Sequence, residues 1–346
     1  MSDNSANNKR IAKNTLFLYF RTILIMLVTL YTSRVVLNTL GVEDFGVYNA
    51  VGGVVSMFAV ISGALSNAIS RYITYGLGKG DKEKLKMIFC TSVNIQIIIA
   101  LIIFVLCEIV GLWFLNSRMN IPEDRLVAAN WVLHCSLLTF VVNLISVPYN
   151  ACIIAHEHMN AYAYISIFDA ILKMSVAYLL IVSPVDKLIA YSVLLFVTAL
   201  GVRLLYGFYC GRHFKECKYK PIYDRVLFKE MMGFAGWNFF GNATSVLNIQ
   251  GVNILINVFF GVVANSARGI ASQIDAAVNQ LVVTFTTAVN PQITKSYAQG
   301  DSQRLNYLVC KGAKFSFFLL LLFAVPLFFE ADTILKIWLV NVPEGA

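Results

Sequence analysis

The chain has 346 residues, of which 58% are hydrophobic and only 13% are charged, and its mean hydropathy is +0.70. Soluble domains carry about 25% charged residues, so this composition excludes an ordinary soluble domain and indicates a membrane protein. The formal charge of +8 does not indicate nucleic-acid binding, because the cations lie in loops between apolar segments.

The predicted secondary structure is a series of membrane-spanning helices. The sequence contains nine runs of about 20 apolar residues, the length that a helix needs to cross the hydrocarbon core. The first run follows the polar residues 1–13 and is too long for a signal-peptide core, so we expect a retained span. We expect Pro291 to end the eighth helix. The predicted spans are 14–38, 46–70, 87–114, 127–150, 160–182, 188–210, 231–258, 264–290 and 312–330.

Lysine and arginine mark one side of the membrane. Eighteen of the 27 cations lie in the N-terminal segment and in alternate loops, around residues 71–86, 212–229 and 295–314, whereas five lie in the opposite loops. Cationic loops stay on the cytoplasmic side of a membrane. This bias therefore predicts a cytoplasmic N-terminus and supports the number of spans.

One stretch of the sequence occurs twice. Leu40-Gly41-Val42 and Gly80-Asp81 correspond to Phe260-Gly261-Val262 and Gly300-Asp301 at one constant offset. A fixed register over roughly 100 residues indicates a duplicated unit. Six spans precede the second copy, so both copies begin on the same side of the membrane, as in transporters with parallel repeats.

The repeat and the loops divide the chain into segments. We expect a cytoplasmic N-terminal segment (1–13), a first lobe with transmembrane helices 1–6 (14–210), a basic cytoplasmic linker (211–229) and a partial second lobe with helices 7–9 (230–346). Two full copies would be longer than this chain, so roughly three helices of the second lobe are expected to be missing. We expect a fragment; the alternative is that a neighbouring chain supplies the missing helices.

Polar residues recur at helical spacing on the seventh and eighth predicted spans. The eighth span carries Arg268, Asp275 and Asn279 near one direction, and the seventh carries Asn242 and Asn253 on another polar face. Lipid cannot hydrate these groups, so we expect both faces to lie against protein or a water-filled cavity. The uncharged residues are equally well explained by interhelical hydrogen bonds that hold the bundle together.

Ionisable residues inside the spans favour a cavity over helix packing alone, because a charge at mid-membrane costs roughly 2.5 to 3.5 kcal/mol. Asp169 and Lys173 are four residues apart and are expected to pair. Arg203 is expected to reach the cytoplasmic interface. Arg21 and Arg268 have no carboxylate within one helical turn in the sequence with which to pair, and they are expected to face a cavity. The excess of cations inside the spans suits an anionic passenger such as a phosphate or pyrophosphate.

Signals for enzymatic or metal chemistry are weak. The seven cysteines are scattered, without a C-x-x-C pair, and are expected to be small hydrophobic residues. His156-Glu157-His158 lies in a short predicted turn with no third ligand nearby in the sequence, so we expect no metal site. The sequence contains no glycine-rich phosphate loop, nucleophile elbow or catalytic carboxylate pair, so we expect no catalytic residue.

A family resemblance rests on residues 33–48, SRVVLNTLGVEDFGVY, followed by Arg71-Tyr72-Ile73 and Gly78-Lys79-Gly80-Asp81. This stretch resembles the opening of polysaccharide exporters (Wzx-type O-antigen flippases) of the MATE-like multidrug, oligosaccharidyl-lipid and polysaccharide exporter (MOP) superfamily. The resemblance implies an all-α, polytopic, two-lobed helix bundle with parallel six-helix repeats, in which helices 1, 2, 7 and 8 line a central cavity. The second copy departs from the pattern where Ala264-Asn265-Ser266 replaces Asp44-Phe45-Gly46.

The resemblance implies a flippase that moves a polyprenyl-pyrophosphate-linked oligosaccharide across the bacterial cytoplasmic (inner) membrane by alternating access. The passenger would be an O-antigen, capsule or exopolysaccharide repeat unit. The expected partners are this lipid-linked oligosaccharide, membrane lipids and other polysaccharide-assembly proteins, and no nucleic acid. No cofactor is expected beyond H⁺ or Na⁺ as a coupling ion. The candidate residues are Arg21 and Arg268 for the pyrophosphate, Asn242, Asn253 and Asn279 for the sugars, and Asp275, Asp169 and Lys173 for ion coupling.

Other functions stay open at this point. A MATE-type ion-coupled drug exporter of organic cations would need net acidic cavity walls, and the basic excess speaks against it. A peptidoglycan-precursor flippase is a second transport alternative. A membrane-embedded glycan polymerase or acyltransferase would need a large outer loop or a catalytic cluster of His, Asp and Arg, whereas the predicted outer loops are short.

Overall fold

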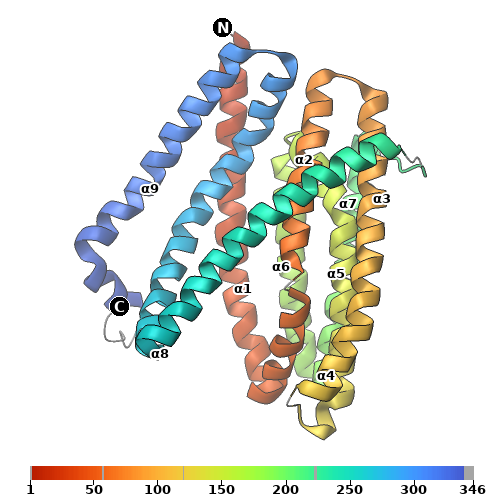
Figure 1. The fold of residues 1–346 in the computed structure, drawn as a ribbon, viewed down its shortest axis with the longest axis vertical. Helices are drawn as coiled ribbons and strands as arrows, with labels where there is room; N and C mark the ends of the chain where they lie inside the picture. The colour runs from red at the N-terminus through yellow and green to blue at the C-terminus, as the bar shows by residue number, and fades with distance from the viewer. Residues whose placement is uncertain (1, 57, 120, 222–223, 339–346) are drawn as a thin grey trace. The chain divides into compact units, whose positions relative to one another are not determined.

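The computed structural model describes residues 2–56, 58–119, 121–221 and 224–338, and in these ranges it contains helices and no strand (Figure 1). Some side chains within these ranges are outside the described set, among them those of Asn253 and Arg268. The all-helical prediction is confirmed. The elements are α1 (Ser2–Ser56), α2 (Ala59–Lys79), α3 (Lys82–Leu106), η1 (Cys107–Gly111), α4 (Leu112–Arg118), η2 (Glu123–Arg125), α5 (Leu126–Ala155), α6 (Met159–Val182), α7 (Lys187–His213), η3 (Lys215–Cys217), α8 (Arg225–Gln299) and α9 (Ser302–Trp338).

The chain divides into two compact units. The larger unit is Phe20–Phe239, and the smaller unit combines Met1–Tyr19 with Phe240–Ala346. Both α1 and α8 therefore contribute residues to both units. The predicted lobes at 14–210 and 230–346, with the linker at 211–229, stay a prediction.

The first predicted span lies in α1, which is interrupted at Gly41. Gly41 has φ 83° and ψ 168°, a combination that is open to glycine and strained for other residues. The chain therefore changes direction after the first span. The rest of α1, residues 42–56, and then α2 follow this bend.

The turn that closes the duplicated stretch has the same local structure in both copies. Gly80 and Gly300 each have φ 74°, and each is followed by an aspartate at the start of the next helix. The carboxylate of Asp81 accepts a hydrogen bond at 3.0 Å from the backbone N–H three residues later, and that of Asp301 does so at 2.9 Å. A left-handed glycine that ends one helix and an aspartate that caps the next make a tight turn. The sequence repeat is therefore also a structural repeat at this turn.

The core of the larger unit lies around α5. This helix packs against α2, α3 and α7, while α6 packs against α7. Phe89, Leu137 and Ile153 are among the largest side chains that are fully buried there. The surface is apolar as well, since the side chains of Leu101 and Ile102 on α3 are each 58% exposed. A bundle that is apolar both inside and outside fits a lipid environment, in which packing rather than burial from water holds helices together.

Six helical segments of the described residues are long and apolar enough to cross a membrane. They coincide with the first, third, fourth, fifth, sixth and ninth predicted spans. The other three predicted spans, 46–70, 231–258 and 264–290, lie in segments that include residues outside the described set. The six segments are Arg10–Gly41, Lys82–Ser117, Glu123–Ala155, Met159–Val182, Lys187–His213 and Ser302–Thr333.

The expected helix end at Pro291 is wrong. α8 contains Pro291 in its interior and continues to Gln299. A proline removes one backbone hydrogen bond, and neighbouring helices can support the turn on either side of it. The helix ends instead at the left-handed Gly300, where the backbone itself leaves the helical conformation.

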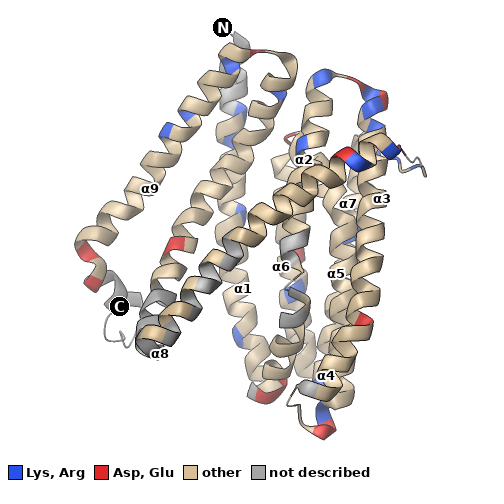
Figure 2. Ribbon diagram, viewed as in Figure 1, with Lys and Arg blue, Asp and Glu red and all other residues tan. Residues whose placement is uncertain are grey.

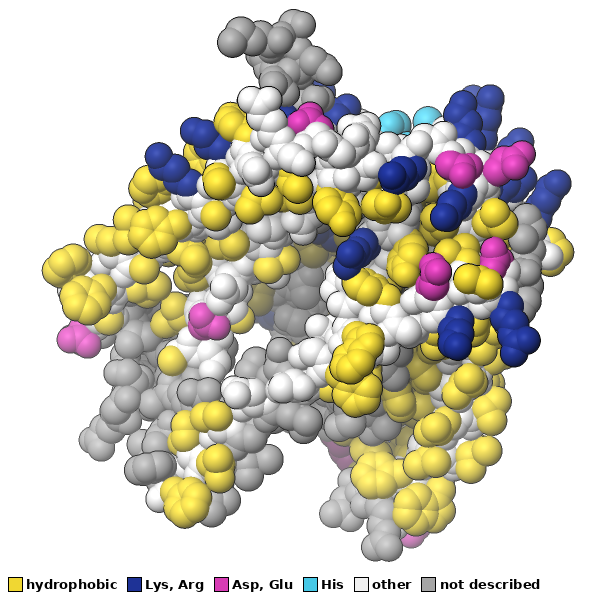
Figure 3. Space-filling view, turned by 45° about the horizontal axis from the view of Figure 1, so that its top comes forward, with side chains coloured by type: hydrophobic (Ala, Val, Ile, Leu, Met, Phe, Trp, Pro, Cys, Tyr) yellow, Lys and Arg dark blue, Asp and Glu magenta, His cyan; other side chains and the backbone are white. Residues whose placement is uncertain are grey.

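Charged residues lie mostly towards the ends of the helices (Figure 2). In the larger unit, Lys and Arg side chains gather at the turn between α2 and α3 and around the start of α8 (Figure 3). Exposed members of this group include Lys79, Lys82, Lys218 and Arg225. These are the loops that the sequence predicts to be cytoplasmic.

The smaller unit is held together by contacts of the first turns of α1 with α8 and by contacts of α8 with α9. The Tyr19 hydroxyl donates a hydrogen bond to the Leu281 carbonyl at 3.0 Å, and the rings of Phe285 and Phe315 lie 6.3 Å apart. These helices line a cavity of about 530 Å³ with mostly apolar walls. Its described lining includes one ionised side chain, that of Lys311, among mostly apolar residues.

Candidate functional site

The larger unit contains a cavity of about 740 Å³. Side chains from α1, α2, α5, α6 and α7 line it. Its volume falls within the range of roughly 300–1,000 Å³ that is usual for ligand pockets. Polar and ionisable residues on membrane-spanning helices make such a cavity a functional-site candidate. They include Arg21, Asn143, Asn150, Ser166, Asp169 and Lys173.

Arg21 of α1 lines this cavity. Its Cζ atom lies 4.5 Å from the centroid of the Tyr162 ring, so the aromatic face stabilises the guanidinium. Its Nε is buried and has no hydrogen-bond partner among the described residues. A buried donor without an acceptor costs free energy, and an anion in the cavity would supply the acceptor. Arg21 therefore faces a cavity, as expected, and its role in binding stays a prediction.

Asp169 and Lys173 lie on the same wall, one helical turn apart on α6. The Lys173 Nζ donates a hydrogen bond to Asp169 Oδ2 at 2.7 Å, so the predicted pair is confirmed. The side chain of Asp169 is 28% exposed and that of Lys173 is 48% exposed. Because both line the cavity, the pair can be reached by a ligand.

A polar stripe on α5 completes the wall, and the predicted site does not include it. Thr139, Asn143, Ser146 and Asn150 follow one another at intervals of four, three and four residues, which puts them on one helix face. The Asn150 Oδ1 is buried without a partner among the described residues. The same helical spacing that predicted the polar faces of the seventh and eighth spans is the signal for this stripe.

Aromatic side chains give the cavity a second kind of surface. Tyr48, Tyr162, Tyr191 and Tyr206 all line it. The rings of Tyr48 and Tyr191 pack 4.9 Å apart at an interplanar angle of 60°. Amides, hydroxyls and aromatic faces together offer hydrogen bonds and apolar contact, a combination that suits a polyhydroxylated ligand.

The other predicted site residues belong to α8 in the smaller unit. The Asn279 Nδ2 donates a hydrogen bond to Asp275 Oδ1 at 2.8 Å, and both side chains are exposed. Asn242 is half-buried. The side chains of Asn253 and Arg268 lie outside the described residues. The predicted residues are thus divided between the two units, and the contacts found among them are Asp169 with Lys173 and Asp275 with Asn279.

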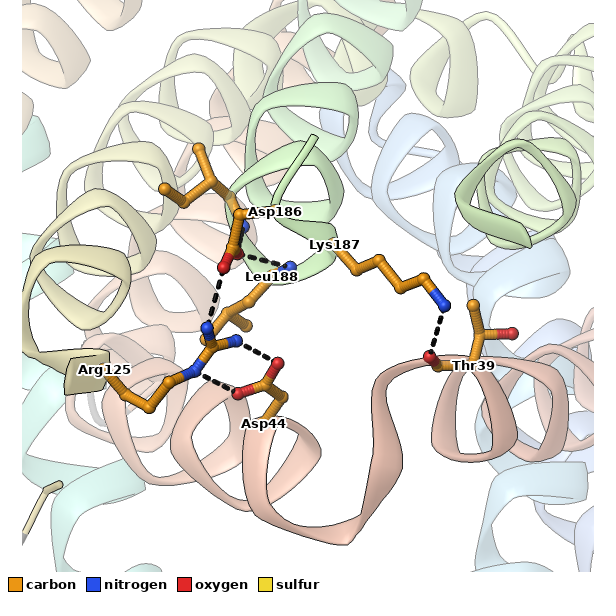
Figure 4. Close-up of polar contacts among 7 residues, drawn as sticks. Thr39, Asp44, Arg125, Asp186, Lys187 and Leu188 are labelled. Atoms are coloured by element: carbon orange, nitrogen blue, oxygen red, sulfur yellow. Dashed lines mark hydrogen bonds and ion pairs between the residues drawn. The ribbon is translucent and has the colours of Figure 1, made fainter. Parts of the chain in front are cut away.

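Three helix ends or bends of the larger unit meet at a charged cluster that the sequence does not predict. Arg125 lies between Asp44 and Asp186 (Figure 4). Its Nε donates to Asp44 Oδ1 at 2.7 Å, its Nη2 donates to the other oxygen of Asp44, and its Nη1 donates to Asp186 Oδ2 at 2.7 Å. We name these three residues the Arg125 cluster. It joins the start of α5 to the bend after the first span and to the start of α7.

Asp186 has a further task at the start of α7. Its Oδ1 accepts hydrogen bonds from the backbone N–H groups of Leu188 at 3.0 Å and Ile189 at 3.1 Å. Partial burial opposes ionisation, but the hydrogen bonds from Ile189, Arg125 and Leu188 outweigh it and lower the pKa of Asp186 below its usual value. The ionised carboxylate therefore caps a helix and binds Arg125 at the same time.

Comparison with known proteins identifies the family. Residues 11–297 match the family described as polysaccharide biosynthesis protein. Over 320 residues the chain is also 22% identical to the uncharacterized membrane protein EpsK of Bacillus subtilis (strain 168). That alignment covers 92% of this chain and 63% of EpsK, so the chain spans less than two thirds of the length of that relative.

Solved structures show the fold. An outward-facing multidrug resistance MATE family transporter of the MOP superfamily gives a TM-score of 0.79 at 13% identity, covering 97% of this chain and 75% of that one. A MOP superfamily transporter from Pyrococcus furiosus, described as having a binding pocket of reverse polarity, gives the same values. A MATE protein in a bent conformation gives 0.83 at 12% identity, covering 96% and 74%. The chain therefore has the fold of MATE-like MOP transporters, and it is a multi-pass membrane protein that belongs to the polysaccharide biosynthesis protein family.

Proposed function

We propose that this protein is a flippase that moves a polyprenyl-pyrophosphate-linked oligosaccharide across the membrane by alternating access. The observation that carries the proposal is the cavity of the larger unit, in which Arg21, on a membrane-spanning helix, has a buried N–H without a partner among the described residues. A cation inside a span is costly unless an anion or water meets it. Membership of the polysaccharide biosynthesis family supports a glycan passenger, and a pyrophosphate link would supply the anion.

Each candidate residue has a proposed role. Arg21 and Arg268 would bind the pyrophosphate, because guanidinium groups bind phosphate oxygens through paired hydrogen bonds. Coupling to H⁺ or Na⁺ would use Asp275, or Asp169 with Lys173. The amides that would bind the sugars are Asn242, Asn253 and Asn279 from the predicted set, together with Asn143 and Asn150 of the cavity.

We further infer the setting in which the protein works. The passenger would be an O-antigen, capsule or exopolysaccharide repeat unit, and the partners would be membrane lipids and other polysaccharide-assembly proteins. The distribution of Lys and Arg supports a position in the bacterial cytoplasmic (inner) membrane with the N-terminus in the cytoplasm. We assign no catalytic residue and no bond-making step to the protein.

The proposal is tested in cells whose surface glycan depends on this gene. We expect Arg21→Ala to lower surface glycan by roughly 10- to 100-fold, because a hydrogen bond to a charged group is worth about 1.5–3 kcal/mol. The lipid-linked precursor should accumulate in the cytoplasmic leaflet. Surface glycan is measured by lectin or antibody binding, with the membrane level of the protein checked by immunoblot.

A matched control separates the site from general charge loss. Arg212→Ala removes an exposed cation near the end of α7, outside the cavity, and should leave export at the wild-type level. Normal surface glycan in Arg21→Ala cells would overturn the role given to Arg21. Covalent turnover of a labelled lipid-linked glycan by the purified protein would favour a polymerase or acyltransferase instead.

The transport alternatives are separated by their cargo. A drug exporter should protect cells against organic cations, yet the charged residues of the cavity, Arg21 and Lys173 against Asp169, leave an excess of positive charge that disfavours such cargo. A peptidoglycan-precursor flippase should support growth when the resident flippase is depleted. Loss of surface glycan without either effect supports the proposed function.

A further inference from the structure

The described residues that line the cavity of the larger unit include two cations and one anion, and two of these three form an ion pair. Lys173 donates to Asp169 at 2.7 Å, whereas the Nε of Arg21 has no partner among the described residues. Within the described part of the chain, Lys173 is also the one hydrogen-bond donor to the Asp169 side chain. These three side chains therefore carry a formal excess of one positive charge.

Lys173 is the mobile member of this group. Its ammonium stands at the end of a flexible four-carbon stem, and its side chain is 48% exposed on the cavity wall. An ion pair between neighbouring residues on one helix turn is weak when it is partly exposed, of the order of 0.3–0.5 kcal/mol. A phosphate oxygen beside Arg21 would therefore compete well for Lys173.

Charge balance then acts on Asp169. Counting only the side chains of this cavity, and not Arg268 of the smaller unit, a pyrophosphate that links a lipid to a sugar brings about two negative charges and turns the excess of one positive charge into an excess of one negative charge. A cavity walled by protein and lipid penalises net charge, because the charged form of a group loses solvation there. Protonation of Asp169 restores neutrality.

Resting on the flippase function proposed above, we propose that the anionic headgroup takes Lys173 away from Asp169, and that Asp169 binds a proton in exchange. The N–H···O bond from Lys173 to Asp169 breaks, and an N–H···O bond from Lys173 to a phosphate oxygen forms. The proton that completes the O–H bond on Asp169 comes from water. Lys173 thus pairs with the Asp169 carboxylate until the anionic headgroup binds.

The charged and titratable groups around Asp169 come from three of the five lining helices. α2 and α5 contribute no ionisable side chain to the lining, whereas α1, α6 and α7 do. Tyrosines are neutral near pH 7 and do not change the balance. The ionisable groups that line the cavity with Asp169 are Arg21 and Tyr48 from α1, Tyr162 and Lys173 from α6, and Tyr191 and Tyr206 from α7.

Because a proton replaces Lys173 at Asp169 when the headgroup binds, headgroup binding and proton uptake are thermodynamically linked. If binding takes up a proton, affinity must rise as the pH falls, by up to tenfold per pH unit. The wild-type protein alone allows this measurement. It needs a probe that does not itself titrate, and farnesyl-pyrophosphoryl-hexose has no phosphate group that titrates between pH 5 and 8.

The experiment is titration calorimetry of the purified chain with farnesyl-pyrophosphoryl-hexose, in two buffers of different ionisation enthalpy at each pH. The difference in heat between the buffers gives the number of protons taken up per ligand. We expect uptake that approaches one proton for the wild type. Asp169→Asn should bind the probe several-fold more tightly, because Lys173 is free, and should take up close to no proton at any pH.

Two controls make the same charge changes outside the cavity. Glu123→Gln removes an exposed carboxylate on η2, and Lys187→Gln removes an exposed ammonium at the start of α7. Both should bind the probe and take up protons as the wild type does. Lys173→Gln should lower the affinity by roughly tenfold, as expected for the loss of one cation that contacts phosphate.

The possible results separate the exchange from the proposed function. Proton uptake that is equal in the wild type and in Asp169→Asn overturns the exchange and leaves the flippase proposal intact, as does binding without any uptake. Failure of the wild type to bind the probe overturns both. Size-exclusion profiles show whether each variant is folded, and a wild-type affinity that does not change with pH would overturn the exchange without any variant.

Discussion

At the scale of single residues, one arginine holds three separate parts of the larger unit. Arg125 binds both oxygens of Asp44 and one oxygen of Asp186, and these partners lie 81 and 61 residues away in the sequence. The planar guanidinium can serve two carboxylates at once, which the single ammonium of lysine cannot do with the same geometry. Asp44 belongs to the Leu-Gly-x-x-Asp-Phe-Gly stretch, so that stretch has a structural task here.

We expect Arg125→Ala to lower the free energy of unfolding by about 1–3 kcal/mol, because it leaves two partly buried carboxylates without their shared partner. The side chains of Asp44 and Asp186 are 15% and 33% exposed, so water compensates only in part. SDS titration of the purified protein in mixed micelles measures this loss. Glu123→Gln, on the same short helix as Arg125, is exposed and should change stability by less than about 0.5 kcal/mol. Equal stability of the two variants would show that the Arg125 cluster contributes nothing.

At the scale of elements, the turn from one helix into the next depends on a glycine. The left-handed conformation at Gly80 gives any residue with a Cβ a steric cost, even though the space around it is open. Gly300 repeats this geometry before α9. The helices therefore end where the backbone requires it, rather than where the apolar run ends.

The same substitution should have opposite effects at two glycines. Gly80→Ala should destabilise the protein by about 1 kcal/mol, since alanine is strained at φ 74°. Gly211→Ala lies in α7, where an added Cβ meets open space, and should be neutral or stabilise by up to about 1 kcal/mol. Unfolding in SDS measures both variants. A loss of stability of the same size at both positions would contradict the role given to the left-handed turn.

At the scale of the whole molecule, the orientation in the membrane can be tested with a native cysteine. Six of the seven cysteines are buried, and Cys310 is exposed. It lies on α9 beside Lys311, in the stretch that the sequence predicts to be cytoplasmic. Its counterpart in the first copy of the repeat, Cys90, is fully buried.

A membrane-impermeant maleimide should therefore label Cys310 in inside-out vesicles and not in right-side-out vesicles. Cys310→Ser should abolish the label, because buried thiols react slowly. Ser183→Cys, placed in the Cys310→Ser background, lies between α6 and α7 on the predicted outer side and should show the reverse pattern. Labelling of Cys310 from the outside would overturn the predicted topology.

Much of the fold could be predicted because lipid constrains sequence strongly. Apolar runs of sufficient length gave six spans that coincide with membrane-length helices, and the repeat gave the matching turns at Gly80 and Gly300. The end of α8 could not be predicted from Pro291, because a proline stays inside a helix when its neighbours support the turn.

The site could be predicted only in part. Arg21 and the pair of Asp169 with Lys173 could be predicted, because charged residues are rare inside apolar spans. Asn143 and Asn150 carry no charge and were not predicted to belong to the site, although their spacing places them on one helix face. The Arg125 cluster joins segments that are distant in sequence, and local patterns contain no information on such contacts.

The Arg125 cluster also changes what the recognisable stretch around Asp44 can tell an investigator. The Asp44 carboxylate joins helix ends through Arg125. The presence of this stretch in a chain therefore indicates how the helices are assembled and indicates little about what the chain binds. Two chains that share this stretch can therefore differ in the ligand that they bind. To distinguish such chains by their ligand, one must compare the residues at positions 21, 169 and 173, which line the cavity of the larger unit.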